Sequence, residues 1–243
     1  MVERGTQGHL ASPQASVTGW VLAGGEGRRV QGQDKGLLLH RGQPLAEWVA
    51  RALAPQCSSL ACSANRHHTE YGTLLERACA STTPSPRNGG VWPDDPDLLA
   101  LDHAPGRATG DSAKGPRRLH GPLAGILTAL SHSHTEWVLV AACDTPHLPA
   151  DLCARLLQAA QNSHADIAVP VTRGGDGDAA SERHHWVCAL IRKRVSPHLR
   201  EAFVNGERKV GAWMRSLAWQ GVCFAPESDF QNMNTLETLH GRD

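Results

Sequence analysis

Short apolar runs alternate along this chain with segments of helical periodicity, and this alternation limits the possible fold more than any other feature. The clearest apolar run is 136–143 (EWVLVAAC), and a second, at 17–23, is followed directly by glycines. Their length and apolar character are typical of strands buried on both faces. Buried strands that alternate with helices predict an α/β fold with a mostly parallel central sheet.

The remaining apolar and periodic segments complete this pattern. Further strands are expected at 58–64, 91–92, 165–171, 186–191 and 220–224. Helices are expected at 44–54, 69–78, 121–132, 149–162, 196–204 and 208–218, with a last helix near Thr235. Ligands of such folds bind beyond the carboxyl ends of the strands, so the loops that follow strands are the candidate sites.

Two segments lack this periodicity. Residues 1–16 are polar, without the apolar stretch of a secretory signal, and we expect a disordered leader. Residues 95–119 are rich in Pro, Gly, Asp and Arg, and predict a mobile insertion, with an active-site flap as the alternative. We expect 17–243 to form a single domain with this insertion, because the length suits one domain.

Composition excludes several classes of protein. The 24 Lys and Arg balance the 24 Asp and Glu, which argues against a general nucleic-acid binder. No apolar run approaches the roughly 18 residues of a spanning helix, so no membrane association is expected. The 7 cysteines contain no CxxC pair, which favours reduced thiols in the cytoplasm over disulfides or a zinc site.

The loop after the first strand, 22–35, has the sequence LAGGEGRRVQGQDK. Glycines such as Gly24 and Gly25 let the backbone approach a ligand closely, and successive amides can bind an anion. Arg28 and Lys35 add positive charge for a polyphosphate. The spacing fits neither a Walker loop nor a dinucleotide fingerprint. The alternative is a glycine-rich turn with a solvated basic patch.

Asp144 directly follows the strand at 136–143, at the end where a ligand is expected. One carboxylate there can hold Mg²⁺, which binds phosphates through few protein oxygens and several waters. The alternative is that Asp144 caps the following turn. We expect the neighbouring Cys143 to be a buried residue and not a nucleophile, because the sequence shows no base for it.

Five motifs occur here in order: LAGG followed by arginines, DKG, GPLAG, CDTP and a terminal NxNT. Together they resemble the molybdenum cofactor guanylyltransferases of the nucleotidyltransferase superfamily. The resemblance covers about 17–240 and implies a Rossmann-like three-layer α/β/α nucleotidyltransferase fold. It also implies transfer of GMP from GTP to molybdopterin with Mg²⁺ as the cofactor and pyrophosphate as the product.

The resemblance assigns expected roles to individual residues. Leu22, Ala23, Gly24 and Gly25 would begin the GTP-binding loop, and Lys35, with Arg28, would contact phosphates. Asn65 and Asp94 would lie at the nucleotide site, with Asp95 as the alternative register, and Asp144 would ligate Mg²⁺. Asn232 and Asn234 would lie near the pterin or the catalytic centre. The segment 183–185 (RHH) could meet the pterin phosphate or form a solvated loop.

The chain departs from the family pattern in three places. Val30 and Gln31 replace a usual Met-Gly, Trp186 replaces a proline after His185, and Leu236 replaces a proline after Asn-Thr. These changes bear on the pterin contacts more than on the nucleotide chemistry.

Three different functions stay open at this point. A related enzyme that uses CTP usually carries LAAG, and the second glycine here favours a purine. A sugar-1-phosphate nucleotidyltransferase is a more distant enzyme, and a chaperone of molybdenum cofactor would bind nucleotide without turnover. For a guanylyltransferase we expect a cytoplasmic monomer that contacts cofactor-insertion proteins or apoenzymes transiently.

Overall fold

The computed structural model describes residues 17–23, 34–95, 121–174 and 181–233 of the chain. Several predictions fall on residues outside these ranges. They concern the leader at 1–16, nearly all of the insertion at 95–119, the helix near Thr235, and the site residues Gly24, Gly25, Arg28 and Asn234.

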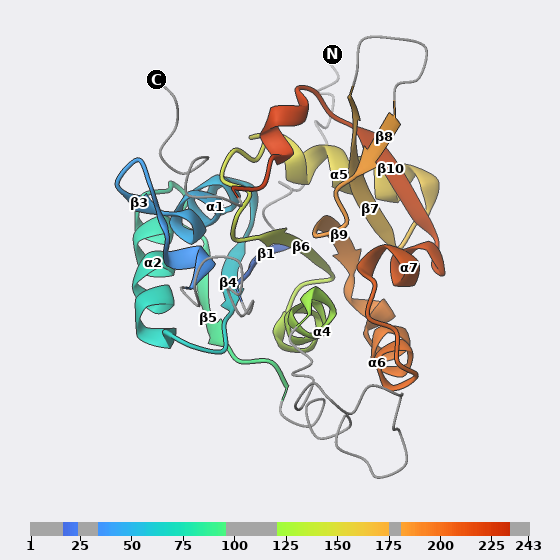
Figure 1. Ribbon diagram of the computed structural model, residues 1–243, viewed down its shortest axis with the longest axis horizontal. Helices are drawn as coiled ribbons and strands as arrows, with labels where there is room; N and C mark the ends of the chain where they lie inside the picture. The colour runs from blue at the N-terminus through green and yellow to red at the C-terminus, as the bar shows by residue number, and fades with distance from the viewer. Residues whose placement is uncertain (1–16, 24–33, 96–120, 175–180, 234–243) are drawn as a thin grey trace, which may run out of the picture.

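An eight-stranded sheet forms the centre of the molecule (Figure 1). Its order is β10-β7-β9-β6-β1-β4-β5, with β8 paired to β7. Neighbours in β6-β1-β4-β5 and in β7-β10 run parallel, whereas β9 is antiparallel to both β6 and β7. The prediction of a mostly parallel sheet is therefore confirmed. The strands of this sheet are β1 (Val17–Leu22), β4 (Ser59–Ser63), β5 (Arg87–Trp92), β6 (Trp137–Ala142), β7 (Ile167–Gly174), β8 (Ser181–His184), β9 (Cys188–Arg192) and β10 (Trp219–Cys223).

Helices cover both faces of the sheet and make the three predicted layers (Figure 1). Helices α1, α2 and α5 pack on one face, and α4, α6 and α7 pack on the other. A small separate hairpin of β2 (Leu39–His40) and β3 (Gln43–Pro44) precedes α1. The helices are α1 (Leu45–Leu53), α2 (His68–Ala80), α4 (Pro122–His132), α5 (Leu152–Ser163), α6 (Ser196–Val204) and α7 (Val210–Arg215).

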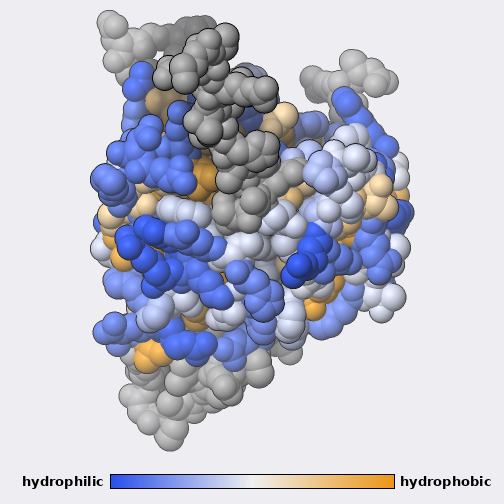
Figure 2. Space-filling model, turned by 180° about the vertical axis from the view of Figure 1, so that it is seen from behind, coloured by the Kyte–Doolittle hydropathy of each residue, from blue (hydrophilic) through white to orange (hydrophobic). Residues whose placement is uncertain are grey.

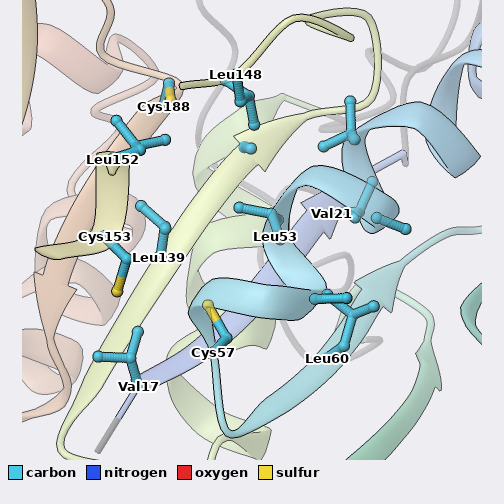
Figure 3. Close-up of a cluster of buried hydrophobic side chains, with 14 of the residues drawn as sticks. Val17, Val21, Leu53, Cys57, Leu60, Leu139, Leu148, Leu152, Cys153 and Cys188 are labelled. Atoms are coloured by element: carbon cyan, nitrogen blue, oxygen red, sulfur yellow. The ribbon is translucent and has the colours of Figure 1, made fainter. Parts of the chain in front are cut away.

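The buried strand β1 shows how the sequence supports two helical layers. Val17 and Val21 point into the cluster beneath α1 and α5, beside Leu53 (Figure 3). Trp20 and Leu22 belong to the opposite cluster, beneath α4. Because successive strand residues face opposite sides, an apolar run without alternation is needed between two layers of helices.

The GPLAG segment sets the distance between α4 and the carboxyl ends of the strands. Gly125 lies on α4, and a Cβ added there would be 2.9 Å from Ser63 Oγ and 3.1 Å from Leu22 Cδ2. The helix therefore lies closer to β1 and β4 than any other residue type would allow. This motif has a packing role directly beside the expected ligand site.

Substitution of Gly125 by valine is expected to lower the free energy of unfolding by about 2 kcal/mol, because the added methyl groups overpack this contact. Thermal or urea unfolding measures the change. Gly72→Ala on α2 is the matched control, since a Cβ there meets no atom within 4 Å. That variant should be more stable by about 0.5–1 kcal/mol. Equal effects of the two changes would contradict this account.

Several expected boundaries differ from the structure. The strand expected at 91–92 begins at Arg87, and its pairing with β4 shifts register at Gly89, where a Cβ would lie 3.0 Å from Ala61 Cβ. The strand expected at 165–171 continues to Gly174 as β7 and pairs with a further strand, β8, which was not expected; Arg173 on β7 pairs with Glu182 on β8 at 3.1 Å. The residues of β8 are polar, so the sequence lacks the alternation of apolar and polar residues that would predict a strand there. The helix expected at 208–218 is shorter, spanning Val210–Arg215.

No helix in the described part of the chain has both the length and the apolar character needed to cross a membrane.

Candidate active site

The carboxyl ends of four neighbouring parallel strands, β5, β4, β1 and β6, meet at one edge of the sheet. Backbone bonds continue the sheet beyond the strands: Ala23 N donates to Ser63 O over 2.8 Å, and Cys143 N donates to Leu22 O over 3.1 Å. The loops that follow are therefore held side by side. Four of the predicted site residues lie in these loops, namely Ala23, Asn65, Asp94 and Asp144.

Lys35 and Asp144, 109 residues apart in sequence, form an ion pair at this edge. Lys35 begins a short 3-10 turn, η3 (Lys35–Leu37), and its Nζ donates to Oδ2 of Asp144. The side chains are 23% and 11% exposed, respectively. The two residues that the sequence favoured most strongly are thus in direct contact.

The second carboxylate oxygen of Asp144 has a different environment. Oδ1 is buried, and no group among the described residues forms a hydrogen bond with it. The main-chain oxygen of the same residue accepts from Met233 N over 2.8 Å. A buried carboxylate oxygen without a donor is costly in a folded protein and suits a cation ligand. Asp144 is therefore a residue that could hold a metal.

Asn65 and Asp94 bind each other reciprocally. Asn65 Nδ2 donates to Asp94 Oδ2, and Asp94 N donates to Asn65 Oδ1, both over 2.9 Å. Asp94 is only 4% exposed. Asp95, the alternative in the sequence register, instead accepts from Arg200 on α6 over 3.2 Å. The geometry thus joins Asp94, and not Asp95, to Asn65.

The segment after the turn η7 (Glu227–Phe230) returns to the loop that follows β6 (Figure 1). Thr145 Oγ1 donates to Asn232 Oδ1 over 3.4 Å, next to the bond between Met233 and Asp144. Asn232 therefore lies beside the loop that contains Asp144.

The three residues of the segment 183–185 have separate environments. Arg183 pairs with Glu227 at 3.3 Å, and His184 stacks on Trp186. His185 contacts Thr172 Oγ1 through Nε2 at 2.9 Å, and burial, with the nearby Arg183, lowers its pKa to about 4. His185 is thus neutral near pH 7 and adds no positive charge for a pterin phosphate.

Cys143 is buried, as predicted, with 7% exposure. Burial, followed by the neighbouring Asp144, raises the pKa of its thiol above the ordinary value. A thiol that keeps its proton is a poor nucleophile.

Asp34, which belongs to the DKG motif, and Tyr71 have no role assigned from the sequence. Asp34 Oδ1 accepts from Tyr71 Oη over 2.5 Å and from Gly36 N over 3.2 Å, directly beside Lys35. The only available signal was that Tyr71 is the single tyrosine of the chain. In a helix with apolar periodicity, such a residue reads as part of the core.

Comparison with known proteins identifies the family. The profile of the MobA-like NTP transferase domain matches residues 19–222. The chain belongs to this family. A molybdenum cofactor guanylyltransferase of Ralstonia pickettii is 34% identical over 94% of this chain and 96% of the relative. One of Burkholderia ambifaria is 37% identical with the same coverage. The predicted resemblance and the enzyme class, a nucleotidyltransferase, are confirmed.

Solved structures confirm the fold. Molybdopterin-guanine dinucleotide biosynthesis protein A of Archaeoglobus fulgidus has a TM-score of 0.59 at 21% identity, covering 91% of this chain and 94% of that one. The 4-diphosphocytidyl-2C-methyl-D-erythritol synthase of Anaerococcus prevotii has a TM-score of 0.63 at 8% identity, covering 92% of each chain. At these identities the likeness establishes a shared nucleotidyltransferase fold.

Proposed function

We propose that this chain transfers GMP from GTP to the terminal phosphate of molybdopterin and releases pyrophosphate. The observation that carries the proposal is the pair of Lys35 and Asp144, which sets an ammonium and a carboxylate side by side where strands of this fold end. The guanylyltransferases similar to this chain give the nucleotide and the acceptor.

Mg²⁺ fits the proposed site. Asp144 would hold it through Oδ1, the buried oxygen for which the described residues provide no donor. A single carboxylate is enough, because Mg²⁺ keeps several waters and takes its remaining ligands from substrate phosphates. When bound, Mg²⁺ supplies charge neutralisation on the phosphates.

The protein's own part in the reaction is positioning and charge stabilisation. The acceptor phosphate attacks the α-phosphorus of GTP in line, and pyrophosphate leaves with both electrons of the broken bond. The Lys35 ammonium, a compact charge that can follow a moving phosphate, would stabilise the leaving group. Arg28, from the glycine-rich loop, would add to this charge.

The remaining site residues would position the two substrates. Leu22 and Ala23 lead from β1 into the loop with Gly24 and Gly25, whose amides would face the phosphates. The polar pair of Asn65 and Asp94 would place the base or ribose. Asn232 and Asn234 would meet the acceptor, a role supported by the contact of Asn232 with Thr145 beside Asp144.

Asp94→Ala is expected to raise the KM for GTP roughly tenfold, because it removes the acceptor that fixes the Asn65 amide. Asp95→Ala is the matched control. It loses the pair with Arg200, whose side chain is 46% exposed, and should change KM less than about twofold. Steady-state kinetics with varied GTP measures both. A larger effect from Asp95→Ala would transfer the nucleotide contact to that residue.

The function is tested with purified protein, Mg²⁺, molybdopterin and either GTP or CTP. We expect pyrophosphate release and the guanine dinucleotide with GTP only. Release with CTP alone would replace the proposal by cytidylyl transfer, and nucleotide binding without release would favour a chaperone.

We also infer a cytoplasmic monomer that contacts cofactor-insertion proteins or apoenzymes transiently. All 7 cysteines are free thiols and 6 of them are buried, which suits a reducing compartment. Within the described residues, Leu39 is the only large apolar side chain that is exposed. On the face seen in Figure 2, apolar residues form small separate areas among hydrophilic ones, which supports the monomer.

A further inference from the structure

Tyr71 lies in the interior next to Lys35, and the proposed function gives it no role. It is on α2 and is 1% exposed. Its hydroxyl donates to Asp34 Oδ1 over 2.5 Å. The bond joins a helix on one face of the sheet to the residue that directly precedes the proposed phosphate-binding lysine.

The side chain of Asp34, the residue before Lys35, binds the backbone of Gly36, the residue after Lys35. The oxygen that accepts from Tyr71 also accepts from Gly36 N over 3.2 Å. Asp34 is therefore the N-cap of the turn η3, whose first residue is Lys35. Capping of this kind fixes the first residues of a helical turn.

Gly36 brings the turn against the tyrosine ring. A Cβ at this position would lie 2.3 Å from Tyr71 Oη and 3.1 Å from the nearest ring carbons. The phenol thus contacts the turn in two ways, through its hydroxyl bond to Asp34 and through direct packing on Gly36.

The direction of the hydrogen bond is fixed. Burial, followed by the nearby Cys143 and Asp34, raises the pKa of Tyr71 well above its usual value, so the hydroxyl keeps its proton. It therefore donates to Asp34 at any working pH. Phenylalanine would fill the same space but remove this donor, which leaves the Gly36 amide as the donor to this carboxylate oxygen among the described residues.

We propose that Tyr71 is a positioning residue, which holds the turn through Asp34 so that the Lys35 ammonium faces Asp144. The proposal rests on the proposed role of Lys35 in nucleotidyl transfer. It predicts that the hydroxyl of Tyr71 affects turnover only through Lys35.

Tyr71→Phe is expected to lower kcat/KM for GTP roughly tenfold to hundredfold, because displacement of a catalytic group by about 1 Å has effects of that size. Leu75→Val is the matched control, because Leu75 is also buried on α2 and has no assigned role in substrate binding. It should change kcat/KM less than about twofold at a similar loss of melting temperature. A Tyr71→Phe variant with undiminished kcat/KM would overturn the proposal.

A double-mutant cycle separates positioning from general structural damage. With Lys35→Met already present, adding Tyr71→Phe should lower kcat/KM less than about twofold, since the group to be positioned is gone. GTP dissociation constants of the four proteins give the same cycle where turnover is too slow to measure. Equal losses in both backgrounds would overturn the role of Tyr71. Full activity of Lys35→Met alone would remove Lys35 from the reaction and overturn this proposal, whereas absence of turnover in the parent protein would overturn the proposed function.

Gly36→Ala tests the same contact from the other side if Tyr71→Phe folds poorly. The added methyl group meets Tyr71 Oη and should displace the turn, lowering kcat/KM at least about tenfold. Unchanged turnover in that variant would show that the turn is not held against the ring, and would overturn the proposal.

Discussion

Asp144→Asn is expected to lower kcat roughly 10³-fold while the protein stays folded, because the variant loses both the charge opposite Lys35 and the proposed ligand for Mg²⁺. The substitution keeps the shape of the side chain. It also keeps the main-chain oxygen that accepts from Met233 N over 2.8 Å. Pyrophosphate release, followed over a range of Mg²⁺ concentrations, measures the loss, and circular dichroism checks the fold.

Asp151→Asn is the matched control for this change. Asp151 has a 60% exposed side chain and pairs with Arg155 at 3.7 Å. An exposed ion pair of this kind contributes little to stability, and Asp151 has no assigned role in the reaction. Its kcat and Mg²⁺ dependence should stay as in the parent protein. Substantial turnover of Asp144→Asn at ordinary Mg²⁺ concentrations would remove Asp144 from the proposed metal site.

Lys35→Met is expected to lower kcat/KM for GTP roughly 10²-fold, through the loss of charge stabilisation on the leaving pyrophosphate. Lys35→Arg should recover little of this activity, because a planar guanidinium does not replace a compact ammonium in the same space. Kinetics with varied GTP measure both variants. The expected fall is larger in kcat than in GTP affinity, since the charge develops on the leaving group during transfer.

Lys193→Met is the control for the loss of a lysine. Lys193 Nζ donates to the Ser133 carbonyl, in the connection that precedes β6, at the opposite edge of the sheet. The variant should lose some thermal stability but no kcat. A similar loss of kcat in both lysine variants would point to general destabilisation and contradict the assignment of Lys35.

The parts of the fold and site that could be predicted from the sequence depend on buried strands and on their parallel order in the sheet. Apolar runs such as 136–143 must be strands, and residues directly after parallel strands must meet at one edge. For that reason Asp144 was recognised from its position after β6, and Lys35 from its residue type in the glycine-rich loop after β1, although 109 residues separate them. Asn65 and Asp94 needed the family resemblance, because their reciprocal bonds depend on the spacing of β4 and β5.

Other features depend on contacts that no local pattern reveals. Tyr71 has the spacing of a core residue, and only the tertiary structure places its hydroxyl on Asp34. The strand expected at 91–92 left out Gly89, yet β5 begins at Arg87 and passes through Gly89 with a shift of register against β4. None of the described side chains of the polar strand β8 belongs to either buried cluster, and its sequence has no alternation of apolar and polar residues.

The antiparallel strand β9 has a consequence for the order in which the chain can fold during synthesis. β6 pairs with β1 on one side and with β9 on the other, and β9 ends only at Arg192. Until that residue leaves the ribosome, the half of the sheet from β5 to β6 presents an unpaired apolar edge. The nascent chain therefore carries an aggregation-prone edge for about 50 residues of synthesis, a period in which chaperone protection would matter most.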